Sequence, residues 1–193
     1  MNWGGIMVVR CTWVANYGED DLMTAYHDHE WGRPTHGDQQ LFELLSLETY
    51  QAGLSWQTVL HKRAAFRIAF AQYDIDQVAQ MTATDIDRLL QNADIIRHRQ
   101  KLTATIANAQ GIQRIQHDYG SFDAWLWSFV QRTPIDNRVI DYTQTPSSTD
   151  LSKSVSKAMK AYGFKFVGPV TVYAFMQAAG LINDHELTCE WHG

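Results

Sequence analysis

The segment AYHDHEWG, residues 25–32, combines two histidines, two carboxylates, a tyrosine and a tryptophan. Residues of these types bind metals, transfer protons or recognise ligands through aromatic faces. An HEXXH zinc site is excluded because Arg33 stands where the second histidine would be, and a zinc-deaminase site because the chain has no CXXC. A Walker A loop, GxGxxG and a GxSxG elbow are also missing. A metal site, an acid–base site, an aromatic pocket and a simple polar turn remain as interpretations of the segment.

The two cysteines of the chain, Cys11 and Cys189, lie near its opposite ends. His185 precedes Cys189 by four positions, so both side chains would share one face of a helical turn. With His27 or His29 they could form the two-cysteine, two-histidine set that binds zinc tetrahedrally. Such a site has no open coordination position, so the zinc would be structural. The start MNWGGIMVVR lacks a signal-peptide pattern, so we expect a cytoplasmic, reducing location, where a disulfide is disfavoured and free thiols are the alternative.

Helical periodicity predicts an all-α domain. The chain has 193 residues, of which 45% are hydrophobic and 19% charged, enough for one domain with a substantial core. Between residues 38 and 70 the pattern breaks at Gly53, which predicts two helices with a turn near AGLS, the first capped by Asp38. No useful strand alternation is present. We expect further helices at residues 74–81, 82–91, 93–116, 121–132, 151–163 and 169–181.

The charge pattern limits the partners. A net charge of −5 argues against nucleic acid, but two local basic patches permit phosphate contact. One is RHRQK at residues 97–101, and the other is the stretch 151–183, which contains four lysines and no acidic residue. The longest apolar run, residues 169–182, is too short to span a membrane, so no membrane partner is expected.

A set of long motifs, in this order, resembles the DNA-3-methyladenine glycosylase I family. They are CTWV at 11–14, YHDHEWGRP at 26–34, LFELLSLETYQAGLSWQTVLHKR at 41–63, IIRHRQKL at 95–102 and GFKFVGPVTVYAFMQAAGLINDH at 163–185. The resemblance implies a single helix-hairpin-helix glycosylase domain at residues 11–193, preceded by a variable extension at residues 1–10. It also implies a structural zinc that ties residues 11–27 to residues 185–189. The implied ligands are Cys11, His27, His185 and Cys189, which selects His27 over His29.

The activity implied by this resemblance is hydrolysis of the N-glycosidic bond of 3-methyladenine in alkylated duplex DNA, which releases the free base. The base must be flipped out of the stack, and no lysine stands out as a nucleophile for strand cleavage. The enzyme would act as a monomer. The rival hypotheses are an inactive, zinc-stapled DNA-binding module of the same fold and a metal hydrolase of another substrate.

The resemblance also assigns site residues. Glu48 would be the catalytic or base-recognising carboxylate, Tyr26 and Trp56 would stack on the base, and Trp13 and Trp31 would line the pocket.

For DNA, Gly53 and Leu54 would form a wedge. The helix-hairpin-helix would span about residues 83–109, with backbone amides near NADIIR binding a phosphate, assisted by Arg97, Arg99 or Lys101. The chain departs from the family at Asp94, where the hairpin usually has glycine, and at Met23, where the pocket edge often has tyrosine. We expect Asp94 to adopt the left-handed conformation of that glycine.

Overall fold

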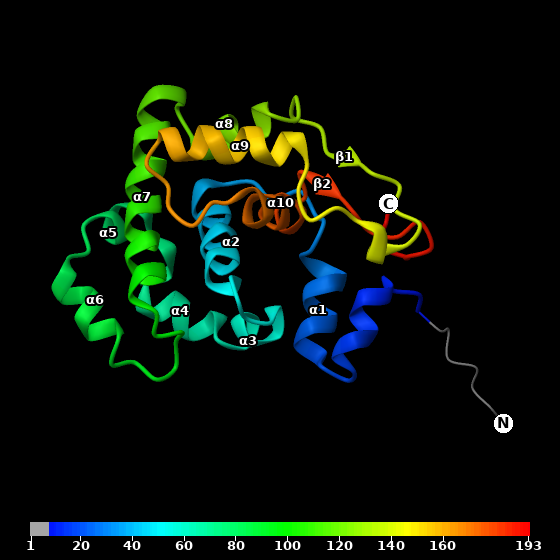
Figure 1. The fold of residues 1–193 in the computed structure, drawn as a ribbon, viewed down its shortest axis with the longest axis horizontal. Helices are drawn as coiled ribbons and strands as arrows, with labels where there is room; N and C mark the ends of the chain where they lie inside the picture. The colour runs from blue at the N-terminus through cyan, green and yellow to red at the C-terminus, as the bar shows by residue number, and fades with distance from the viewer. Residues whose placement is uncertain (1–7) are drawn as a thin grey trace.

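Helix α2 (Asp38–Gln51) lies at the centre of the molecule in the computed structural model, which describes residues 8–193 (Figure 1). Residues 41–50 of this helix are all buried, including Glu43 and Glu48. Helices α7 (Arg99–Tyr119) and α10 (Pro169–Ala178) pack against it. Because α2 is enclosed by neighbours, its polar side chains are forced into the interior, where they need partners.

Shorter elements surround this centre, and the expected helical architecture is confirmed. The other α-helices are α1 (Asp21–His29), α3 (Trp56–His61), α4 (Arg63–Ala69), α5 (Ile75–Ala79), α6 (Ala83–Leu89), α8 (Phe122–Ser128) and α9 (Asp150–Ala161). The 3-10 segments are η1 (Thr12–Tyr17), η2 (Ala71–Tyr73) and η3 (Tyr142–Gln144). Two short parallel strands, β1 (Ile135–Asp136) and β2 (Ile182–Asn183), were not expected. Within residues 8–193, no helix has the length and apolar character needed to cross a bilayer.

The break between α2 and α3 is confirmed, but the cap of α2 is not Asp38. Gly53 has a φ of +82°, which glycine adopts without strain, and the Ser55 hydroxyl caps α3. The residue before α2 is Gly37. The Asp38 carboxylate instead accepts hydrogen bonds from the amides of Phe122 (3.0 Å) and Asp123 (2.8 Å), so it stabilises the start of α8.

Residues 90–98 form a turn between α6 and α7, so the helix expected from residue 93 begins only at Arg99. The expectation for Asp94 was wrong, because its φ is negative. The turn is held instead by the Asn92 side chain, which accepts a hydrogen bond from the Asp94 amide at 2.9 Å. Two helices joined by a turn thus occupy the region of the expected helix-hairpin-helix, whose DNA-binding role stays a prediction.

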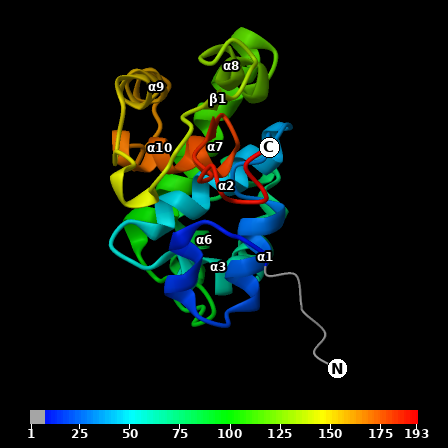
Figure 2. The ribbon, with the colours of Figure 1, turned by 90° about the vertical axis from the view of Figure 1, so that its right-hand side faces the viewer.

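The two ends of the described chain lie side by side (Figures 1 and 2). The Val9 amide donates to the Glu190 carboxylate, and the Glu190 amide donates to the Val9 carbonyl, both at 3.0 Å. Of the extension expected at residues 1–10, residues 1–7 lie outside the described part, while Val9 and Arg10 are held against the domain. This pairing brings the N-terminal cysteine to the C-terminal one.

Candidate functional site: an aromatic cavity beside a cysteine–histidine cluster

A cavity of about 150 Å³ opens against α2, and the walls come from elements distant in sequence. Segments η1, α1, α2, α3, α10 and η3 all contribute side chains. The lining residues are Trp13, Tyr17, Tyr26, Trp31, Glu48, Gln51, Trp56, Tyr142, Ala174 and Gln177. The structure therefore brings together all five residues that the family resemblance assigned to base binding or catalysis.

The aromatic walls are packed in pairs. The rings of Tyr26 and Trp56 have centroids 5.1 Å apart at an angle of 49°. The rings of Trp13 and Trp31 meet edge to face at 5.2 Å. Such packing leaves little rotational freedom, so the cavity presents fixed aromatic faces of the kind that bind a flat or cationic ligand.

Glu48 is the only carboxylate among the residues that line this cavity. Its side chain is buried, and its Oε2 atom has no hydrogen-bond partner within the described residues. Burial raises the pKa of Glu48 to about 8, because the charged form loses its hydration. The indole nitrogens of Trp13 and Trp56 are likewise buried without a partner in residues 8–193. Buried polar atoms are normally paired, so these three atoms indicate a ligand that supplies the missing partners.

Five cavity residues were not found by sequence reasoning: Tyr17, Gln51, Tyr142, Ala174 and Gln177. Tyr142 lies in a polar stretch without a motif and reaches the cavity because its amide donates to the Glu186 carboxylate at 2.9 Å. Burial raises the pKa of Tyr142 to about 12. Met23, expected at the pocket edge, is fully buried in the core and is not among the lining residues.

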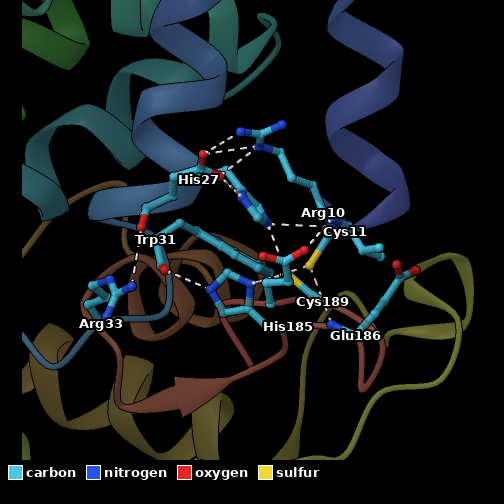
Figure 3. Close-up of polar contacts among 11 residues, drawn as sticks. Arg10, Cys11, His27, Trp31, Arg33, His185, Glu186 and Cys189 are labelled. Atoms are coloured by element: carbon cyan, nitrogen blue, oxygen red, sulfur yellow. Dashed lines mark hydrogen bonds and ion pairs between the residues drawn. The ribbon is translucent and has the colours of Figure 1, made fainter. Parts of the chain in front are cut away.

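Beside the cavity, Cys11, His27, His185 and Cys189 form one buried cluster (Figure 3). Their ligand atoms all lie within 4.8 Å of one another. His185 Nδ1 is 3.3 Å from Cys11 Sγ and 3.5 Å from Cys189 Sγ, and His27 Nε2 is 3.6 Å from Cys189 Sγ. Tetrahedral zinc separates a bound sulfur from a bound nitrogen by about 3.5 Å, so the four residues fit a zinc ion.

The protonation chemistry of the cluster also fits a cation. Burial lowers the pKa of His27 and takes that of His185 to about 4, so both imidazoles are neutral, as ligands must be. Burial raises the pKa of the Cys11 thiol above its usual value, so the thiolate needs a nearby positive charge. A divalent metal would supply that charge.

The remaining imidazole nitrogens are held by the protein, which fixes the two rings. His27 Nδ1 lies 2.7 Å from the Asp28 carboxylate, and His185 Nε2 lies 2.9 Å from the Trp31 carbonyl (Figure 3). Arg10 donates to both oxygens of Asp28 at 2.7 to 3.0 Å. Sequence reasoning gave Asp28 no role; its position directly after His27 was the only signal.

The expected helical turn around His185 and Cys189 was wrong. The Cys189 amide donates to the Glu186 carbonyl at 2.8 Å, which closes a tight turn that still points both side chains into the cluster. Gly32 permits the close approach of His185. Its φ is +73°, and a Cβ there would lie 2.7 Å from the His185 ring.

The residues assigned to DNA contacts differ in exposure. Leu54 is 42% exposed on the turn after Gly53, and Arg97 is exposed on the turn between α6 and α7. Lys101, in contrast, is 5% exposed, and its ammonium donates to the carbonyls of Tyr50 (2.8 Å) and Ala52 (2.5 Å). Lys101 therefore binds the end of α2, and the expectation that it contacts phosphate is withdrawn.

Comparison with known proteins agrees with this geometry. The model of the methyladenine glycosylase family matches residues 13–192. The DNA-3-methyladenine glycosylase of Haemophilus influenzae is 48% identical over 183 residues, which cover 95% of this chain and 97% of the relative. The DNA-3-methyladenine glycosylase 1 of Escherichia coli is 46% identical over 180 residues, which cover 93% of this chain and 95% of the relative. A similar solved structure is a tyrosine-to-phenylalanine variant of a 3-methyladenine DNA glycosylase I in complex with 3-methyladenine. The two structures match with a TM-score of 0.91 at 43% sequence identity, and the match covers 93% of this chain and 97% of the chain of that variant. The chain belongs to the methyladenine glycosylase family.

Proposed function

We propose that this protein hydrolyses the N-glycosidic bond of 3-methyladenine in alkylated DNA and releases the free base. The observation that carries the proposal is the buried carboxyl group of Glu48 at the wall of an aromatic cavity, whose Oε2 atom has no hydrogen-bond partner among the described residues. The names of the relatives and the bound base in the solved variant support the same substrate.

The cavity chemistry suits this base because methylation at N3 gives the adenine of a nucleoside a positive charge. Aromatic faces attract a cation, and a nearby cation favours the ionised form of a carboxyl group. With Glu48 ionised, its oxygens accept hydrogen bonds from the base. An unmodified adenine carries no charge, so it would leave a buried carboxylate uncompensated. Selectivity for the lesion thus comes from charge as well as from shape.

Hydrolysis of the cationic nucleoside needs little assistance. The C1′–N9 bond breaks with its electron pair moving to the base, which neutralises the positive charge, so no proton is needed on the leaving group. Water forms the new bond to C1′ and releases a proton to the solvent. The role of Glu48 is to hold the base while its charge changes, and the aromatic walls exclude bulk water.

The base must leave the duplex before it can enter the cavity. We assign the wedge to Leu54, which is exposed on a turn where Gly53 lets the backbone approach DNA closely. The backbone amides of the turn between α6 and α7, with Arg97, would bind a phosphate. The protein would act on duplex DNA as a monomer and leave the abasic strand uncut.

The cysteine–histidine cluster would hold zinc with all four positions filled by protein. Such an ion supplies no reaction chemistry. The cluster residues tie the N-terminal segment to the C-terminal turn and so fix the elements that carry Trp13, Tyr26 and Trp31.

A base-release assay tests the proposal. Duplex DNA methylated with radiolabelled dimethyl sulfate is incubated with the protein, and the released bases are separated by chromatography. We expect free 3-methyladenine and no strand cleavage. DNA binding without release would favour an inactive module, and loss of activity on zinc chelation without loosening of the fold would favour a metal hydrolase.

A further inference from the structure

Two lysines connect the segment 50–62 with the segment 93–101, and each donates hydrogen bonds to the backbone of the opposite segment. Lys101, in the first turn of α7, donates to the carbonyls of Tyr50 and Ala52 at the end of α2. Lys62, where α3 meets α4, donates to the carbonyls of Asp94 (3.0 Å) and Ala93 (3.3 Å). Each segment therefore holds the backbone of the other through a charged group.

The environment of Lys101 argues for a specific task. Its side chain is 5% exposed, and burying an ammonium group is costly unless it is hydrogen-bonded. If the side chain of Lys101 only filled space, methionine would serve as well. The ammonium instead binds carbonyls at the end of α2, where a helix leaves such groups without partners and favours a cation. It thereby fixes the exit of α2 into the turn that carries Leu54.

Lys62 fixes the backbone of the turn between α6 and α7 in the same way. It is half-buried and binds two consecutive carbonyls at the tip of the turn between α6 and α7. That turn has no glycine in the left-handed conformation to shape it. With these carbonyls directed to Lys62 and the Asp94 amide donating to Asn92, the tip is held from both sides.

The geometry points to Lys62 and Lys101 as positioning residues that keep the Leu54 turn and the turn at residues 90–98 in a fixed position relative to each other. This inference rests on the proposed function, in which the first turn enters the base stack and the second grips a phosphate of the same DNA. Leu54 can enter the base stack only if the turn at residues 90–98 holds the duplex at a fixed distance from it. The two lysines make the two turns one rigid unit, although neither lines the aromatic cavity.

The test compares Lys62→Met and Lys101→Met with wild type in three measurements. These are single-turnover release of 3-methyladenine from methylated duplex DNA, the Kd of free 3-methyladenine followed by tryptophan fluorescence, and the melting temperature. We expect each variant to slow release by about 10- to 100-fold, because small misplacements of a reacting group cost this much. Affinity for the free base should be unchanged. Lys62→Arg, which can donate to the same carbonyls, should restore release.

Thr105→Val is the matched control, since Thr105 lies one turn beyond Lys101 on α7 and its hydroxyl is within 2.9 Å of the Tyr50 hydroxyl. It should lower the melting temperature while release well below that temperature stays at the wild-type rate. Release by both methionine variants at the wild-type rate would overturn the inference, as would a parallel loss of release and free-base affinity. If Lys101→Met fails to fold, Lys62→Met and its arginine rescue decide alone. A wild-type protein that releases no 3-methyladenine would instead refute the proposed function.

Discussion

Replacing Glu48 with glutamine separates the charge of this side chain from its shape. Glu48 is buried in the middle of α2 with one oxygen unpaired in the described residues, and burial raises its pKa to about 8 from an ordinary 4.5. Between these two values the folded protein keeps a proton that the unfolded chain has lost. Stability therefore falls as pH rises through this window, and below about pH 4.5 the effect vanishes.

The size of the effect follows from the two pKa values. One pKa unit corresponds to about 1.4 kcal/mol, so wild type should lose about 3 kcal/mol of unfolding free energy relative to Glu48→Gln between pH 5 and pH 8. Base release should fall by about 10- to 100-fold in the variant, since hydrogen bonds to a charged group contribute about 1.5 to 3 kcal/mol. The variant should thus be more stable at pH 8 and less active.

Denaturant unfolding at several pH values, combined with the base-release assay, measures both effects. Glu43→Gln is the control, because Glu43 is buried on the same helix but does not line the cavity. Burial alone would raise the pKa of Glu43, but hydrogen bonds from Arg67 and Arg63 outweigh it and lower that pKa. Its substitution should therefore destabilise the protein at neutral pH. Parallel pH profiles for wild type and Glu48→Gln, or wild-type release by that variant, would refute the reasoning.

Four further substitutions test the metal cluster and the DNA surface. Cys189→Ser should first lower zinc content and melting temperature, with activity falling as a consequence; unchanged zinc stoichiometry by atomic emission would contradict the ligand assignment. Gly32→Ala should cost about 2 to 4 kcal/mol, since it strains a positive φ and places a Cβ against the His185 ring; a wild-type denaturation midpoint would show that the approach is not tight. Leu54→Ala should slow single-turnover release about tenfold or more without lowering the melting temperature, because the side chain is exposed in free protein and fills the stack only on DNA. Asp94→Asn should strengthen duplex binding about two- to fivefold at low salt, because it removes a negative charge near phosphate. This gain in affinity should disappear at high salt. A gain that persists at high salt would point to a conformational cause.

Local signals predicted the helices well, and tertiary contacts explain the failures. The glycine at position 53 and the cap at Ser55 mark the end of α2 and the start of α3 within a few residues. The start of α7 was missed because Ile95 and Ile96 continue an apolar pattern that suits a helix. In the structure they lie in a turn whose carbonyls bind Lys62, and no local sequence rule reports that contact.

The residues of the candidate site were likewise predictable only in part. Residue types and spacing could propose zinc, but they could not choose between His27 and His29; the family resemblance made that choice, and the clustering of all four residues agrees with it. Tyr142 was out of reach, because it joins the cavity through a hydrogen bond to Glu186, which is 44 positions away. Contacts of this kind depend on the finished fold.

Trp31 explains why one short segment serves both the cluster and the cavity. Its carbonyl binds His185 Nε2 at 2.9 Å, its ring packs edge to face against the His185 ring at 4.6 Å, and the same ring lines the cavity. Along α1, Tyr26 lines the cavity while the next residue, His27, enters the cluster, since consecutive helical side chains point in different directions. Displacing His185 therefore moves a wall of the cavity without touching Glu48. Removal of the proposed zinc should therefore loosen this part of the fold and so weaken base binding through the aromatic walls, while the pH dependence that Glu48 imposes stays in place.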